Sequence, residues 1–232
     1  LGMGFATFRA PARSVLFSLI LICAFSATAF GSGFLFYRSY FRPAGHLHTE
    51  VRERAIVSQA DQLGSAQLVI VGDSIVELGY FDTLCPDRVL NAGVGGFRVA
   101  DTARLVAKLT DKIDARVFAI AAGVNDAQRS EPRNIKKWLS DYEAILAGLS
   151  GKRIVIIGVA PVEAGMPIGD KYFDPAFIDA ENAGLAALAA RYHADFVAPP
   201  QSMAGKTVDG VHSRPEAYAD LIGRIRSSGA CN

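Results

Sequence analysis

The sequence predicts an α/β fold in which a parallel sheet is covered by helices on both faces. Short apolar runs alternate with longer stretches of helical spacing from about residue 66 onward, which is typical of βαβ units. The runs are apolar at successive positions instead of alternate ones, as strands buried on both faces are. The first run also ends in glycine, as expected where a buried strand gives way to a loop.

Five apolar runs are the expected strands, and the stretches between and after them are the expected helices. The strands are predicted over residues 66–72, 87–93, 115–123, 152–161 and 194–199. The helices are predicted over residues 98–114, 132–150, 174–193 and 214–228, where apolar residues recur at three- and four-residue steps. Pro215 falls near the first turn of the last helix, where proline is well tolerated.

Length, charge and cysteine content set limits on the function. The chain has 232 residues and a formal net charge of +1, which suits one globular domain, expected over 66–232, with an appendage. Nucleic acid is an unfavourable partner, because it selects a concentrated basic surface. Cys85 and Cys231 could pair in an oxidising compartment, and two unpaired small residues are the alternative.

The N-terminal part of the chain has a different character. It contains no charged residue between Arg13 and Arg38, a gap close to the ~20 apolar residues that span a bilayer. We therefore expect a short tail over 1–13, a transmembrane anchor over 14–37 and a juxtamembrane linker with some helix over 38–65.

Two other interpretations of this segment stay open. A cleaved signal peptide would use Ala27 and Ala29 as its processing site. A buried core helix is less favoured, because the segment is apolar on every face. The anchor and the signal peptide would both deliver the domain outside the cytoplasm, to a periplasm or cell surface, and a cleaved form would be secreted.

Four polar or glycine-rich clusters fall near the carboxyl ends of the expected strands. They are "GDS" at 72–74, "NAGVGG" at 91–96, "GVND" at 123–126 and "DGVH" at 209–212. Because ligands bind beyond the carboxyl ends of the strands in such sheets, we expect these clusters to converge on one edge.

The converging residues have the chemistry of a catalytic triad. A serine hydroxyl becomes a nucleophile when a base removes its proton, and Ser74 lies at a strand-to-helix turn. His212 is the only histidine expected at this edge, so it is the candidate base. Asp209 lies three residues earlier and could accept from the imidazole Nδ1–H, which would direct Nε2 toward the serine. Asp73 is expected to bind local backbone N–H groups instead.

Hydrolysis also needs donors for the oxyanion of the tetrahedral intermediate. The backbone N–H of Ser74 and the side-chain amide of Asn125 are two candidates. A glycine N–H is the third, and Gly93, Gly95 and Gly96 all remain possible from the residues alone.

The four clusters, in this order and rough spacing, resemble the SGNH or GDSL hydrolase family. The resemblance implies a three-layer, flavodoxin-like α/β/α domain and serine esterase or lipase chemistry without a cofactor or metal. It implies that Ser74 is the nucleophile, that Gly96 and Asn125 donate to the oxyanion together with Ser74, and that Asp209 and His212 complete the triad. The residues after "NAGVGG", Phe97 and Arg98, depart from the family pattern.

The expected function is therefore the cleavage of carboxylic esters by a membrane-tethered enzyme. The esters would be acyl or acetyl groups on lipids or glycans. An acyltransferase would use the same triad. A metal-dependent phosphoesterase and a non-catalytic binding module of the cell envelope are further alternatives. The first of these two would depend on a metal ion, and the second would leave Ser74 unreactive.

Overall fold

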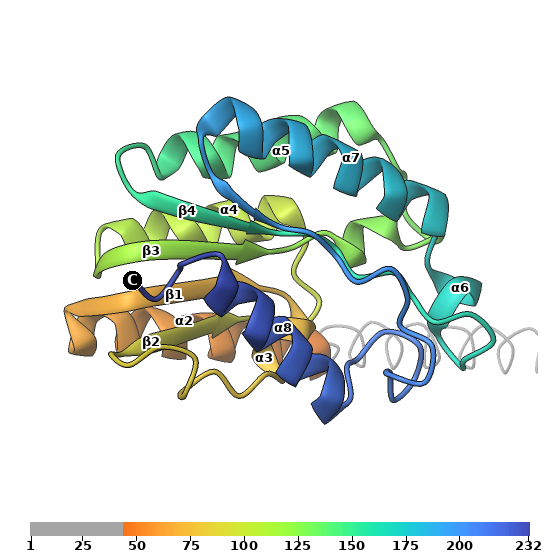
Figure 1. Cartoon of the computed structure of the whole chain (residues 1–232), viewed down its shortest axis with the longest axis horizontal. Helices are drawn as coiled ribbons and strands as arrows, with labels where there is room; N and C mark the ends of the chain where they lie inside the picture. The colour runs from red at the N-terminus through yellow and green to blue at the C-terminus, as the bar shows by residue number, and fades with distance from the viewer. Residues whose placement is uncertain (1–43) are drawn as a thin grey trace, which may run out of the picture. The chain divides into compact units, whose positions relative to one another are not determined.

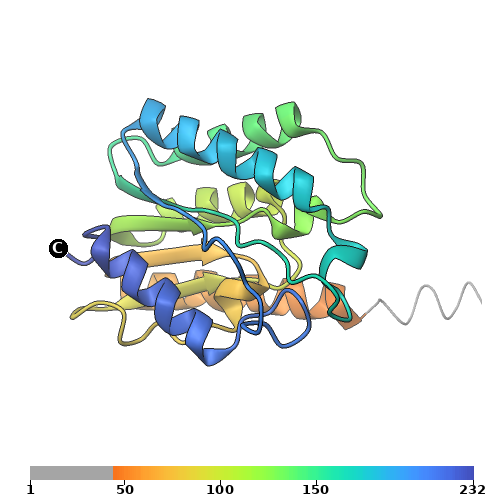
Figure 2. The same ribbon diagram turned by 45° about the vertical axis from the view of Figure 1, so that its right-hand side comes forward.

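A five-stranded parallel sheet with helices on both faces forms the centre of the fold (Figures 1 and 2). The computed structural model describes residues 44–232. The strands are β1 (Ser65–Gly72), β2 (Val89–Gly93), β3 (Asp114–Ala121), β4 (Arg153–Ile157) and β5 (Asp195–Val197). Their order is β2-β1-β3-β4-β5 and every neighbouring pair is parallel. The predicted α/β fold with a five-stranded parallel sheet is thus confirmed, and its strand order is the flavodoxin-like one.

Within residues 44–232, the four predicted helices are present, together with one further long helix and three short ones. The long helices are α2 (Ala44–Leu63), α4 (Val99–Thr110), α5 (Ile135–Gly148), α7 (Pro175–Tyr192) and α8 (Pro215–Ser227). The short ones are α3 (Ser74–Glu77), the 3₁₀ helix η1 (Val124–Ala127) and α6 (Gly169–Tyr172). The boundaries of α5 and α7 follow from their N-caps, because Asn134 and Asp174 accept from backbone N–H groups of the first turn.

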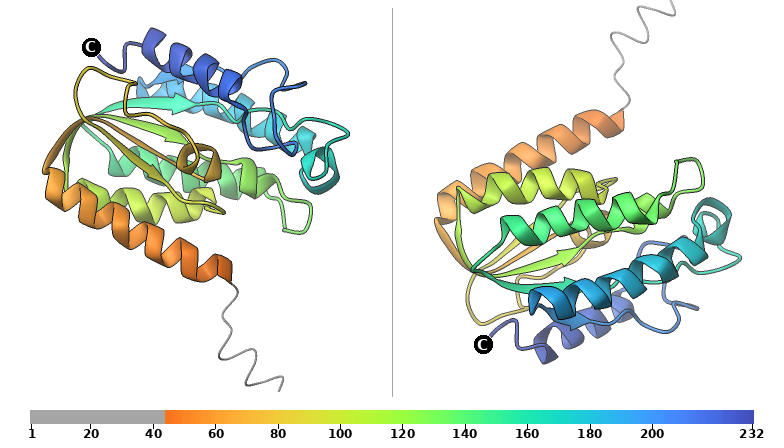
Figure 3. Two further views of the ribbon diagram at one scale, coloured as in Figure 1. Left: turned by 90° about the horizontal axis from the view of Figure 1, so that it is seen from below. Right: turned by 90° about the horizontal axis from the view of Figure 1, so that it is seen from above.

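Along each central strand, alternate side chains lie on opposite faces of the sheet. In β1, Val69 and Val71 belong to the core formed with α2, α4, α5 and α7. Leu68 and Ile70 belong to the second core, which α8 covers with Ile225. Figure 3 shows α4, α5 and α7 together on one face and α8 on the other. This double burial explains why the strands read as continuous apolar runs.

Strand β4 is shorter than the predicted run 152–161. Beyond the end of the strand, a side chain makes the backbone hydrogen bonds that a neighbouring strand would otherwise make. The amide of Asn182 on α7 accepts from the N–H of Val159 at 2.8 Å and donates to its carbonyl oxygen at 2.9 Å. The backbone after Ile157 is therefore free to leave the sheet. Residues 158–161 are apolar because they pack in the interior as a loop, and a buried loop and a buried strand give the same apolar pattern in the sequence.

Helix α2 contributes to the core, although the sequence predicts a linker over 38–65. Ile56 and Ala60 are fully buried and pack in the larger core cluster. One compact unit extends over Thr49–Asn232, so it begins within the predicted linker. The sequence gives little sign of this, because α2 is polar over most of its surface and only a few of its residues face the core.

The predicted tail over 1–13 and the predicted anchor over 14–37 lie outside the described residues. Between residues 44 and 232, no helix combines the length and the hydropathy that a bilayer-spanning segment needs.

A disulfide joins Cys85, in the loop before β2, to Cys231 near the C-terminus. It closes a loop with a sequence separation of 146 residues and lies in the core cluster beneath α8. The pairing that the sequence left open is therefore present. It ties the loop between α3 and β2 to the end of the chain, on the face of the sheet that α8 covers.

Candidate active site

Ser74 lies at the turn between β1 and α3. It is the first residue of α3, so its own N–H has no acceptor within the helix. Asp73 caps this helix, and its carboxylate accepts from the N–H of Ile75 at 2.9 Å. As the sequence predicts, Asp73 therefore binds local backbone. This cap fixes the turn that presents the Ser74 hydroxyl at the carboxyl edge of the sheet.

The loop that carries Asp209 and His212 is closed by its own hydrogen bonds. The N–H of Val208 donates to the carbonyl oxygen of His212 at 2.8 Å. Asp209 Oδ1 accepts from the N–H groups of Val211 at 3.0 Å and His212 at 2.9 Å. Gly210 has φ of 112°, and a Cβ there would lie 2.5 Å from the backbone nitrogen of Gly169. The turn therefore requires glycine for both its conformation and its close packing.

The structure brings the three predicted triad side chains together. His212 Nδ1 lies 2.6 Å from Asp209 Oδ2, and His212 Nε2 lies 3.0 Å from Ser74 Oγ. Burial acts to raise the pKa of Asp209, but the hydrogen bonds from the ring and backbone of His212 and from Val211 outweigh it and hold the pKa below its usual value. Asp209 is therefore ionised at neutral pH and accepts from the Nδ1–H, which leaves Nε2 free to accept from the serine hydroxyl.

Glu163, in the loop after β4, anchors the loop before the triad aspartate. Its Oε1 accepts from the N–H of Gly205 at 2.6 Å, and its Oε2 accepts from the N–H and hydroxyl of Thr207. The Thr207 hydroxyl in turn accepts from the N–H of Gly210 at 3.0 Å. These hydrogen bonds, with the Thr207 hydroxyl first, lower the pKa of Glu163. This role could not be predicted from the sequence, because a single glutamate in a loop gives no signal of its partners.

Of the three candidate glycines, only Gly96 keeps its N–H available. The N–H of Gly93 donates to Asn91 Oδ1 at 3.0 Å, and that of Gly95 donates to Glu77 Oε2 at 2.5 Å. Within residues 44–232, the N–H of Gly96 makes no hydrogen bond. Gly96 has φ of 80°, in the left-handed region that glycine adopts readily. These contacts favour Gly96 over the other two as an oxyanion donor.

The side chain of Asn125 is held by two hydrogen bonds, one to the loop after β2 and one to the residue that follows η1. Its Nδ2 donates to the carbonyl oxygen of Phe97 at 2.9 Å, and its Oδ1 accepts from Gln128 Nε2 at 3.1 Å. A primary amide has two N–H groups, so one remains for an oxyanion. Gln128 thereby fixes the orientation of the amide, a role the sequence did not indicate.

The residues that depart from the family pattern have structural roles. Phe97 is 3% exposed and packs in the larger core cluster. Arg98 pairs with Glu131 at 3.0 Å and occupies the N-cap position of α4, where its side chain makes no capping hydrogen bond. Asp126 supports the same helix, because its Oδ2 accepts from the N–H of Val99 at 3.1 Å. Burial raises the pKa of Asp126 to about 6.

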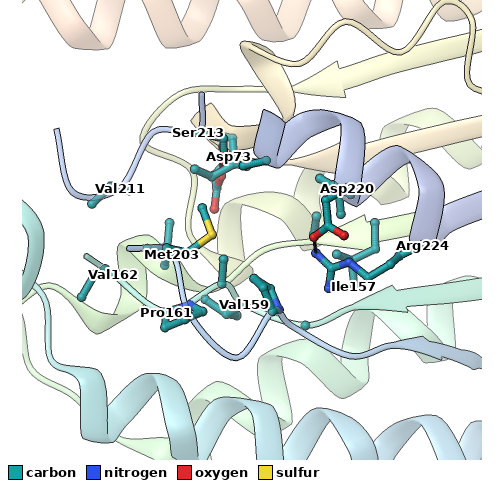
Figure 4. A pocket seen from close by; sticks show the side chains of 18 of the residues that line it. Asp73, Ile157, Val159, Pro161, Val162, Met203, Val211, Ser213, Asp220 and Arg224 are labelled. Atoms are coloured by element: carbon teal, nitrogen blue, oxygen red, sulfur yellow. Dashed lines mark hydrogen bonds and ion pairs between the residues drawn. The ribbon is translucent and has the colours of Figure 1, made fainter. Parts of the chain in front are cut away.

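A mostly apolar pocket lies next to α8, whose Asp220 and Arg224 form part of its lining (Figure 4). It has about 60 Å³ of space for water-sized molecules, and its lining includes the residues on either side of both Ser74 and His212. Those residues are Asp73, Ile75, Val211 and Ser213. Burial here raises the pKa of Asp73 to about 7. The geometry separates the two aspartates, because Asp73 faces this pocket while Asp209 faces the imidazole.

In the part of the chain that the structure describes, no three His, Cys, Asp or Glu side chains are grouped so that they could hold a metal ion. The arrangement can instead activate a hydroxyl, and it has N–H donors on the loop beside it.

Comparison with known proteins places the fold. No family model matches the chain, and no curated protein matches it by sequence. Solved structures do match. A lipase/acylhydrolase from Enterococcus faecalis is 18% identical, with 71% of this chain and 96% of that chain covered and a TM-score of 0.61.

Two further structures give the same result. A GDSL-like lipase from Bacteroides thetaiotaomicron is 19% identical, with 76% of this chain and 96% of that chain covered and a TM-score of 0.61. An acetyl xylan esterase is 16% identical, with 69% of this chain and 98% of that chain covered and a TM-score of 0.60. The protein therefore has the fold of the SGNH or GDSL hydrolases.

Proposed function

We propose that the protein hydrolyses carboxylic esters through an acyl-enzyme on Ser74. The observation that carries this proposal is the series of hydrogen bonds from Asp209 through His212 to the Ser74 hydroxyl, at 2.6 and 3.0 Å. Ser74 and His212 are 138 residues apart in the sequence, so their contact depends on the whole fold. The similarity in fold to lipases, acylhydrolases and an acetyl xylan esterase supports the same chemistry.

Each residue has a defined part in the proposed reaction. His212 Nε2 takes the proton of the Ser74 hydroxyl as Oγ attacks the ester carbonyl, and Asp209 stabilises the imidazolium that forms. The N–H groups of Ser74 and Gly96 and the Asn125 amide donate to the oxyanion. His212 then gives the proton to the departing alcohol, which leaves an acyl group on Ser74. A water molecule, deprotonated by His212, releases the acid and restores the serine.

A direct test is turnover of p-nitrophenyl acetate, butyrate and long-chain esters by the full-length protein. We expect hydrolysis that is unchanged by a metal chelator, because the proposed reaction uses only side chains and backbone N–H groups. Loss of turnover on chelation would favour a metal-dependent phosphoesterase. A folded protein that hydrolyses none of the esters would contradict the proposal. The series of acyl chains also reports the preferred acyl length.

We propose further that the enzyme is membrane-tethered by residues 14–37 and works outside the cytoplasm on ester groups of lipids or glycans. The Cys85–Cys231 disulfide supports this location, because disulfides persist in oxidising compartments. We expect the full-length chain in the membrane fraction, with its domain cleaved by protease added from the non-cytoplasmic side. Recovery from the cytosol with both thiols free would contradict the proposal, and N-terminal sequencing would distinguish an anchor from a cleaved signal peptide.

A further inference from the structure

Arg52 on α2 contacts the strand that leads into the Gly96 loop. Its Nε donates to the carbonyl oxygen of Gly93 at 3.0 Å, and its Nη2 donates to that of Asn91 at 3.0 Å. Both carbonyls belong to β2, the edge strand beside β1, and an edge strand leaves part of its backbone without a neighbouring strand. Arg52 therefore fixes the backbone of β2 at the point where the loop begins.

Glu77 on α3 extends this contact to the loop itself. Its Oε2 accepts from the N–H of Gly95 at 2.5 Å, and its Oε1 lies 3.9 Å from Arg52 Nε. Gly95 directly precedes Gly96, and a Cβ at Gly95 would lie 3.8 Å from the Cβ of Ser74. The two charged side chains thus hold the loop at Gly93 and at Gly95, immediately beside the serine.

We propose that Arg52 and Glu77 are positioning residues that together hold the Gly96 N–H toward the oxyanion. This inference rests on the proposed ester hydrolysis. The Glu77 hydrogen bond uses the N–H of Gly95, which leaves that of Gly96 as the free donor of the loop. Arg52 also offsets the negative charge of Glu77, which would otherwise oppose the charge that develops on the oxyanion nearby. Neither side chain touches the reacting atoms.

A purely structural role for Arg52 would be to dock α2 on the domain, and a second contact of α2 provides the matched control. Glu53, the next residue on α2, pairs with Lys108 on α4 at 2.5 Å. This ion pair docks the same helix but contacts neither β2 nor the Gly96 loop. If docking alone mattered, Lys108→Met and Arg52→Met would have similar consequences for turnover.

The kinetic test compares these two variants in the full-length protein. We expect Arg52→Met to lower kcat for a p-nitrophenyl ester by about 10- to 100-fold, the size of effect that a small misplacement of a catalytic group produces. KM should change much less, because the N–H of Gly96 is used mainly in the transition state. Lys108→Met should leave kcat near that of the wild type. Equal kcat values for the two variants would overturn the inference.

Two substitutions and a double variant test the proposed positioning role of Glu77. Glu77→Gln keeps an oxygen that can accept from Gly95, so it should retain more activity than Glu77→Leu, which keeps none. If Arg52 and Glu77 act on one loop, their effects on kcat should not be additive. Arg52→Met combined with Glu77→Leu should then lower kcat little more than the larger single loss. Fully additive losses would contradict a joint role.

Hydrogen exchange tests the positioning without relying on activity. Arg52→Met should speed amide exchange in the peptide that contains Gly95 and Gly96, whereas Lys108→Met should not, because only Arg52 is linked to that loop. Unchanged exchange in Arg52→Met would overturn the inference even if ester hydrolysis is established. If the wild type hydrolyses no ester but the loop still loosens, the proposed function fails while the structural link survives.

Discussion

Ser74→Ala is expected to lower kcat for ester hydrolysis by about 10⁴- to 10⁶-fold, the loss that follows removal of a serine nucleophile from a triad. His212 Nε2 would lose its hydrogen-bond partner at 3.0 Å, and no acyl-enzyme could form. The fold should persist, because the turn is held by the Asp73 cap and not by the serine hydroxyl. Turnover of p-nitrophenyl acetate, with circular dichroism to check folding, measures this directly.

A matched control is available on β1, the strand that leads to Ser74. Ser65 is the first residue of β1 and is exposed at the opposite end of that strand from Ser74. Ser65→Ala should therefore leave kcat unchanged. If Ser74→Ala retained activity close to that of Ser65→Ala, the serine would not be the nucleophile and the acyl-enzyme mechanism would be wrong.

Asp209→Asn is expected to lower kcat by about 10³- to 10⁴-fold, a smaller effect than loss of the nucleophile. One Asp209 oxygen accepts from the His212 ring and the other from two backbone N–H groups. An asparagine has only one acceptor oxygen, so its NH₂ group must face either the ring or the backbone donors. If it faces the ring, it stabilises the imidazole tautomer that cannot accept the serine proton.

Turnover of p-nitrophenyl acetate by the Asp209→Asn variant measures this effect, and a second carboxylate of the chain provides the control. Asp114→Asn, at an exposed carboxylate paired with Lys152, serves as the control and should match the wild type. An Asp209→Asn variant with wild-type kcat would remove Asp209 from the triad.

Much of the fold could be predicted from the sequence because double burial leaves a clear pattern. The five strands are apolar runs, and the helices between them show periodic apolar residues. Strand β4 ends earlier than the apolar run predicts, because Asn182, far along the chain, makes the hydrogen bonds of the Val159 backbone. The contribution of α2 was missed because its two fully buried residues, Ile56 and Ala60, stand in a polar stretch.

The residues of the candidate site that would take part in the reaction could be predicted from the sequence, whereas the residues that support them could not. Ser74 stands out because it follows an apolar run, and Asp209 and His212 stand out because they lie together in the loop between the last strand and the last helix and supply an acid and a base. Their support could not be predicted, since Glu163 and Arg52 act through contacts between distant segments. Gln128 lies only three residues from Asn125, but the sequence does not show that their side chains meet. The family resemblance already favours Gly96 over Gly93 and Gly95, and the structure adds a physical reason, because the N–H groups of the other two glycines already have acceptors.

The most direct measurement of the central mechanism is covalent labelling by a fluorophosphonate, which reacts only with an activated serine. The mechanism predicts one adduct per chain, located at Ser74 by peptide mass spectrometry, in the full-length protein. The label should be absent from Ser74→Ala and strongly reduced in His212→Ala, because the histidine supplies the base that activates the hydroxyl. A folded protein that remains unlabelled, or an adduct on another serine, would contradict the mechanism.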